Sequence, residues 1–142
     1  MGAMPYLKPA PWFLIGFLIL IFIVHGWALA SSAYFYIWWL DSILHFSGGF
    51  WLAALAIFIL ISREKIYSFE HPLFLFLIII SLVALMGVLW EFFEYGLDLI
   101  LERVGTEAAL QPGAKDTIFD LFFDLTGGIL AQLIFRKRAR RV

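Results

Sequence analysis

Long apolar runs recur four times along the chain, separated by short stretches that contain polar residues, Gly and Pro. A helix needs about 20 apolar residues to cross a bilayer. The runs of that length cover residues 12–30, 39–62, 73–98 and 118–135, and the third could continue to Leu101. The pattern predicts an all-α, polytopic membrane protein whose four transmembrane helices form one membrane domain over residues 1–142.

Composition supports a membrane protein and excludes several kinds of site. Hydrophobic residues make up 63% of the chain and charged residues 15%, whereas soluble domains carry about 25% charged residues. The chain contains no cysteine, which excludes disulfides, thiolate metal sites and cysteine nucleophiles. A net charge of −1 indicates no polyanionic partner, so we expect no nucleic-acid binding.

The first apolar run has two interpretations. Lys8 precedes it and small residues follow it, as in a secretory signal peptide. Its apolar stretch is long for a signal peptide, so we expect a retained membrane helix. The opening residues 1–3 are interpreted as a cloning remnant before the native Met4.

Basic residues predict the orientation in the membrane. Lys8, Arg63, Lys65 and the tail RKRARR at 136–141 all fall on one side of a four-span protein. Because Lys and Arg accumulate in cytoplasmic loops, we expect cytoplasmic N- and C-termini and a multi-pass protein integral to the cytoplasmic (inner) membrane. Interfacial aromatics agree with this orientation, whereas Trp51 and Trp90 lie deeper and are interpreted as packing residues.

Polar residues inside the second and third helices share faces. Asp41 and His45 are four residues apart, and Gly48 falls on the same face, where it would let another helix approach. The third helix has its polar positions within an arc of about 100°. These positions are Glu91, Glu94, Tyr95 and Asp98.

The fourth helix carries a stripe of acids at a spacing of four. The stripe comprises Asp116, Asp120 and Asp124, and Gly127 continues it. Asp116 is also a suitable N-cap for this helix. Gly49, Gly127 and Gly128 are expected to serve close helix packing.

The depths of these residues coincide. At 1.5 Å per residue from the inner boundary, His45 lies roughly 25 Å up, Glu91 roughly 27 Å and Asp124 roughly 16 Å. His25 of the first helix lies roughly 20 Å up by the same rule. All four fall in the outer half of the membrane, which predicts one polar cavity open to the outside.

So many carboxylates without Lys or Arg in any span must be protonated, hydrated or bound to a cation. Carboxylates with an imidazole favour a divalent metal ion, with Mg²⁺ or Mn²⁺ favoured and Ca²⁺, Zn²⁺ or Fe as alternatives. The candidate ligands are Asp41, His45, Glu91, Glu94, Asp120 and Asp124. Among them, His45, Glu91 and Asp120 are the candidate catalytic residues. Whether His25, Asp98 and Asp116 join the site stays open.

Three motifs carry a family resemblance. DxxxHFxGG from Asp41, WExxEY from Trp90 and DTxxDLxxDLxGG from Asp116 resemble the YjdF-like family of bacterial inner-membrane proteins. The match covers about residues 36–130. The motif order is more weakly similar to VanZ-like membrane proteins, which typically carry an Asn near the end of the last motif helix, where this chain has Asp124 before Thr126. The resemblance implies a site and no particular reaction.

Several functions fit this pattern. The first is a metal-dependent membrane hydrolase or transferase that acts on a lipid-linked phosphate substrate at the outer side. The second is an ion or proton-coupled transporter that uses the intramembrane carboxylates. A non-catalytic assembly or sensing subunit, and haem ligation by His25 and His45, are further alternatives. Membrane lipids are the expected partners, and a homo-oligomer stays open.

Overall fold

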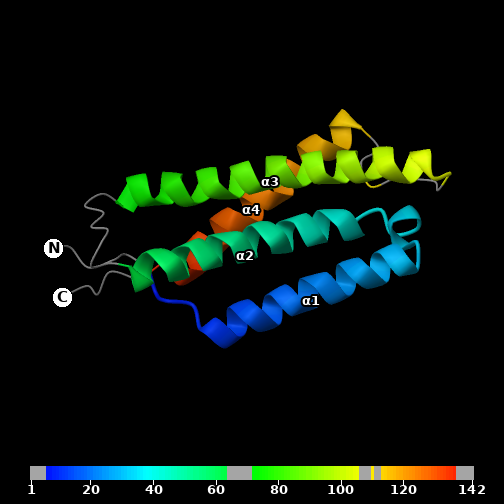
Figure 1. Cartoon of the computed structure of the whole chain (residues 1–142). Helices are drawn as coiled ribbons and strands as arrows, with labels where there is room; N and C mark the ends of the chain where they lie inside the picture. The colour runs from blue at the N-terminus through cyan, green and yellow to red at the C-terminus, as the bar shows by residue number, and fades with distance from the viewer. Residues whose placement is uncertain (1–5, 64–71, 106–109, 111–112, 137–142) are drawn as a thin grey trace, which may run out of the picture.

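Four long helices make up the fold, and the all-α fold class is confirmed. The structure is a computed structural model that describes residues 6–63, 72–105, 110 and 113–136. The elements are α1 (Pro11–Ala30), the 3₁₀ turn η1 (Ala33–Phe35), α2 (Leu40–Ser62), α3 (Pro72–Arg103) and α4 (Ala114–Phe135). Figure 1 shows them as a bundle. Each of the four α-helices is long and apolar enough to cross a membrane.

α4 begins at Ala114, four residues before the predicted start. The N-cap is Gly113, whose φ of 142° is one that an L side chain rarely adopts. The predicted N-cap role of Asp116 is therefore wrong. Asp116 lies in the first turn instead, where a carboxylate interacts favourably with the positive end of the helix dipole.

α3 is longer than the hydrocarbon core requires. Its 32 residues span about 48 Å at 1.5 Å per residue, whereas the hydrocarbon core is about 30 Å thick. In Figure 1 the end of α3 that leads to Arg103 reaches beyond the other helices. α3 thus carries its last turns, including Asp98, towards the membrane boundary at the end of the bundle away from Leu7 and Phe135 (Figure 1).

The start of α1, the end of α2, the start of α3 and the end of α4 meet at one end of the bundle (Figure 1). There the Leu7 N–H donates to the Phe135 carbonyl at 2.6 Å. Tyr6 also pairs with Arg136 in an isolated bridge. The segments at the two chain ends therefore lie on the same side, as predicted. Cytoplasmic placement stays a prediction, and Lys65 and residues 137–141, on which it partly rests, lie outside the described residues.

Burial raises the pKa of the Tyr6 hydroxyl, and the positive charge of Arg136 opposes this shift in part. Tyr6 therefore stays a neutral phenol, and its O–H donates to Oε1 of the buried Gln132 at 3.0 Å. This bond ties the N-terminal segment to the C-terminal part of α4.

Two glycines let α2 and α4 pack backbone against backbone. A Cβ on Gly49 would collide with the main chain of Asp124, and one on Gly127 would collide with the main chain of Phe46. A Cβ on Gly128 would lie 3.1 Å from a methyl group of Val83 on α3. The predicted packing role is therefore correct for these three glycines. It is wrong for Gly48, whose Cβ would meet nothing within 4 Å.

α1 is the most loosely attached helix. It buries only Leu14 and Ala28, and no Cα atom of α1 lies within 8 Å of one in α3. α1 packs on α2 instead, where the Trp51 indole N–H donates to the Leu14 carbonyl at 2.7 Å. The helix is apolar all round, as expected for one that faces lipid on most sides.

Gly127→Ala is expected to destabilise the bundle by about 1–3 kcal/mol, because the new methyl group forces two backbones apart. Thermal unfolding in detergent measures the effect. Gly48→Ala is the matched control and should leave stability nearly unchanged, because a Cβ there enters open space. Equal stability of the two variants would contradict the close contact between α2 and α4.

Candidate functional site

The structure brings together polar side chains from three helices. Five of the six predicted ligands are buried, with exposed fractions of 2–5%, while the side chain of Asp41 is 22% exposed. The set comprises Asp41 and His45 from α2, Glu91 and Glu94 from α3, and Asp120 and Asp124 from α4. The spacing of residues within each helix does not show that three helices meet at these positions. The similar depth of the polar residues along their helices was the signal that predicted one shared site.

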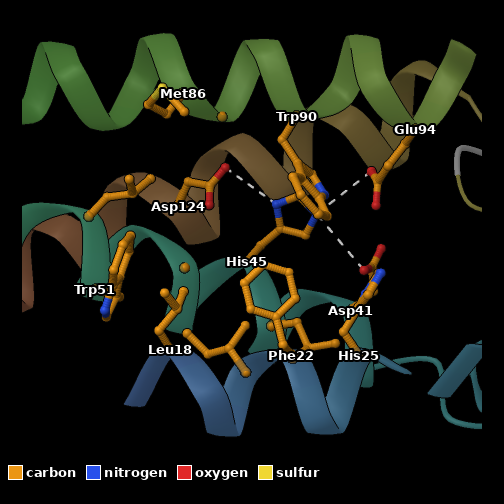
Figure 2. A pocket seen from close by; sticks show the side chains of 15 residues that line it. Leu18, Phe22, His25, Asp41, His45, Trp51, Met86, Trp90, Glu94 and Asp124 are labelled. Atoms are coloured by element: carbon orange, nitrogen blue, oxygen red, sulfur yellow. Dashed lines mark hydrogen bonds and ion pairs between the residues drawn. The ribbon is translucent and has the colours of Figure 1, made fainter. Parts of the chain in front are cut away.

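His45 lies at the centre of the cluster. Its Nδ1 is 3.3 Å from Asp124 Oδ2, whereas its Nε2 is 3.9 Å from both Asp41 Oδ1 and Glu94 Oε2. Figure 2 shows Asp124 on one side of the ring and the other two carboxylates across from it. The shorter distance is within hydrogen-bond range and the longer ones are not. Asp124 therefore orients the ring and turns Nε2 towards the remaining carboxylates.

Two buried atoms face each other in this space without a hydrogen bond. His45 Nε2 and Glu94 Oε2 have no hydrogen-bond partner among the described residues, although both are buried. Buried polar atoms normally have a partner, because leaving one unpaired costs about 1–3 kcal/mol. A cation would satisfy both atoms, because it accepts an electron pair from the imidazole nitrogen and one from the carboxylate oxygen.

The donor atoms are spaced for such a group. One ligand atom each from Asp41, His45 and Asp120 lie within 4.8 Å of one another, and so do those of His45, Glu91 and Glu94. The ligands of one divalent cation lie about 3–4 Å apart for bond lengths near 2.1–2.4 Å. The residues present therefore fit a cation. Asp124 belongs to neither group and instead bonds the far nitrogen of His45, as carboxylates behind a metal-ligating His commonly do.

Sequence reasoning missed the role of Trp90. Its side chain hydrogen-bonds Glu94, so the indole N–H donates to the carboxylate and positions it beside His45. The spacing of four residues on α3 carried that signal. The tryptophan was nevertheless interpreted as a packing residue, because nothing in the pattern ties an indole to a carboxylate.

The sequence did not decide whether Asp98 and Asp116 belong to the site, and the structure places these two residues differently. Asp98 accepts a hydrogen bond from the Leu110 backbone N–H at 3.2 Å, so it holds the loop after α3. Asp116 hydrogen-bonds Asp120 and so extends the cluster outward. Tyr95 shares the arc of the acids on α3 but is 54% exposed, so it does not join the buried cluster.

A cavity of about 280 Å³ adjoins the cluster between α1, α2 and α3. At one end it is lined by Asp41, His45 and Glu94, and elsewhere mainly by apolar side chains. Figure 2 shows Leu18 and Trp51 towards the end away from Glu94. None of the described residues that line the cavity is Lys or Arg. The cavity is therefore polar towards Asp41 and Glu94 and apolar towards Leu18 and Trp51 (Figure 2).

Comparison with known proteins identifies the family. A family model described as "Predicted membrane protein (DUF2238)" matches residues 6–141. The chain belongs to this family. The assignment is consistent with the resemblance to YjdF-like proteins, whereas the resemblance to VanZ-like proteins is not shown. With four apolar helices, this DUF2238 protein is a multi-pass integral membrane protein in contact with lipids.

A relative of this DUF2238 protein comes from Thermotoga maritima and is described as an uncharacterized protein. It is 33% identical over 102 residues, which are 71% of this chain and 50% of the relative. The chain thus spans about half the length of the relative that it matches. No solved structure matches the chain.

Mn²⁺ is expected to stabilise the wild-type protein, because a cation relieves the repulsion between crowded carboxylates. At 100 times the dissociation constant the gain is about 2.7 kcal/mol, measured by thermal unfolding with and without chelator. Glu94→Gln should lose most of this gain. Glu102→Gln, an exposed acid on the same helix, should keep it, and an equal response of the two variants would exclude Glu94 as a ligand.

Proposed function

We propose that this protein is a metal-dependent membrane hydrolase or transferase that acts on a lipid-linked phosphate substrate at the outer side of the membrane. One observation carries the proposal. The unpaired Nε2 of His45 and the carboxylates of Asp41 and Glu94 converge at the polar end of an otherwise apolar cavity.

The donor set favours a particular group of metals. Carboxylate oxygens suit Mg²⁺, Mn²⁺ and Ca²⁺, whereas imidazole suits Zn²⁺ and iron. Mn²⁺ accepts both kinds of ligand, so it is the first ion to test. A bound divalent cation supplies two kinds of chemistry here, the activation of a water molecule and the polarisation of a phosphoryl oxygen.

The residues of the chain take distinct roles in this proposal. His45 would hold the cation together with Asp41 and Asp120, or with Glu91 and Glu94, which are the two groups whose ligand atoms lie within 4.8 Å of one another. Asp124 accepts a hydrogen bond from the Nδ1–H of His45 and keeps the ring in one orientation. A carboxylate that does not bind the cation can act as a general base, so whichever of Asp120 and Glu91 does not hold the cation would take up a proton from an attacking water.

The cavity supports a lipid as the substrate. α1 and α3 flank it, and their Cα atoms nowhere approach within 8 Å. In this proposal a lipid enters from the bilayer between these two helices, which meet through side chains such as His25 and Trp90. The apolar wall includes Leu18, Phe22 and Leu52, and the acids lie at the end of the cavity that we propose faces the outer side. A lipid of the outer leaflet has the same polarity along its length, with its chain towards the membrane centre and its head group outward.

Elemental analysis of protein purified without chelators tests the cation site. The wild type is expected to carry metal at a roughly stoichiometric level, and the double variant Asp120→Asn/Glu91→Gln to lose it. A wild type that is folded and free of metal, and that takes up none when Mn²⁺ is added, would contradict the proposal. That result would favour proton-coupled transport by protonated carboxyl groups.

Release of phosphate from lipid phosphates tests the reaction. Asp120→Asn is expected to lower the rate by about a hundredfold or more, because it removes a carboxylate that binds the cation or accepts a proton. Glu102→Gln is the matched control and should retain the rate. Full activity of Asp120→Asn would remove Asp120 from the mechanism, and no release by the metal-loaded wild type from any lipid phosphate would contradict the hydrolase assignment.

A further inference from the structure

His25 is the only ionisable residue of α1, and it lies where α1 lines the cavity. Asp41, His45 and Glu94 line the same cavity from α2 and α3. The His25 ring also meets the Trp90 ring edge-on, with 5.8 Å between centroids. His25 therefore faces the polar end of the cavity from the one helix that contributes nothing to the acidic cluster.

Tyr34 holds the His25 ring. The two residues are joined by a hydrogen bond of 2.6 Å between Tyr34 Oη and His25 Nδ1. Burial raises the pKa of Tyr34, and the negative charges of Asp41 and Glu94 raise it further. The phenol therefore keeps its proton and donates it to Nδ1 of a neutral imidazole. The ring proton of the imidazole then resides on Nε2, since the hydrogen bond at one ring nitrogen sets the tautomer.

An anionic head group in this cavity lacks the usual partners. No Lys or Arg is among the described lining residues, although phosphate groups are normally bound by such side chains or by backbone N–H groups. A bound cation would be one partner for such a head group. The lining side chains offer few hydrogen-bond donors in addition. The Trp51 indole is committed to the Leu14 carbonyl and Trp90 to Glu94. His25 Nε2 is the donor that these bonds leave.

We propose that His25, positioned by Tyr34, donates a hydrogen bond from Nε2 to an oxygen of a phosphate monoester that binds in the cavity. The head group would then be held between the cation on the α2, α3 and α4 side and His25 on the α1 side. This inference rests on the proposed function, because it assumes the cation and its phosphate ligand. It assigns to α1 a role in ligand recognition.

Two substitutions at one position separate recognition from structure. The amide nitrogen of Gln lies near the place of His Nε2, whereas the shorter Asn side chain reaches only the place of His Nδ1, where its amide oxygen can accept from the Tyr34 hydroxyl. His25→Gln therefore keeps a donor towards the cavity, and His25→Asn keeps only a partner for Tyr34. Tyr34→Phe removes the positioning hydroxyl. Tyr36→Phe is its matched control, because Tyr36 is 83% exposed.

Native mass spectrometry, with the same detergent for every variant, detects Mn²⁺ and the phosphate ligand bound to one protein molecule. The probes are Mn²⁺, dodecyl phosphate, dodecanol and inorganic phosphate. His25→Asn is expected to weaken dodecyl phosphate binding about tenfold or more, the effect of losing a hydrogen bond to a charged group. His25→Gln should retain most of the affinity, and Tyr34→Phe should weaken it. Mn²⁺ occupancy should be the same in all variants, and Tyr36→Phe should match the wild type.

Other outcomes would overturn the inference in distinguishable ways. Unchanged dodecyl phosphate binding in His25→Asn, or weaker binding in His25→Gln than in His25→Asn, would show that His25 does not donate to the ligand. Loss of Mn²⁺ in the His25 variants would place His25 at the cation instead. A wild type that binds no Mn²⁺ would overturn the proposed function and this inference together.

The remaining probes identify the source of the phosphate group. Dodecanol shares the chain and lacks the charge, so its binding should depend on neither Mn²⁺ nor His25. Dodecyl phosphate should bind more tightly than inorganic phosphate, because its chain occupies the apolar part of the cavity. Equal affinity for the two phosphates would overturn the lipid as the source.

Discussion

The backbone contact between α2 and α4 is the constraint on which the rest of the structure depends. It forms where Gly49 meets the main chain of Asp124 and where Gly127 meets that of Phe46. The same contact brings Asp124 within 3.3 Å of His45. In a membrane the hydrophobic effect does not drive helices together, so association relies on such close packing and on interhelical hydrogen bonds. Fold and site are therefore formed by the same few residues.

The acidic cluster adds a cost that this packing alone does not offset. A single charged side chain at the centre of a bilayer costs on the order of 3 kcal/mol, and here several lie side by side. Part of the cost is reduced by position, because α3 is longer than the hydrocarbon core and carries its acids in its C-terminal half. Another part is offset by bonds to Trp90, Asp124 and the Leu110 backbone. His45 Nε2 and Glu94 Oε2 are among the buried atoms left without a hydrogen bond in the described part of the chain, and the proposed cation would satisfy both.

The sequence allowed the fold class, the four helices and the residues of the cluster to be predicted, because apolar length and helical spacing are local properties. Helix boundaries were less accurate where turn chemistry decided them, as at Gly113, which starts α4 before Asp116. The exposure of Tyr95 was not predictable, because an arc of 100° does not say which edge of it meets a neighbouring helix. The pairing of His25 with Tyr34, and the wide separation of the α1 and α3 backbones, depend on how helices pack. Nothing in a single sequence states either of them.

The cavity between α1, α2 and α3 also bears on how the protein behaves outside its native membrane. A detergent molecule has one apolar chain and one polar head, so it matches the cavity about as well as a lipid does. Solubilisation would then fill the cavity with a competitor present at millimolar concentration. Head-group chemistry, rather than the chain, would have to distinguish a true ligand from the surrounding amphiphiles, in a micelle and in the bilayer alike.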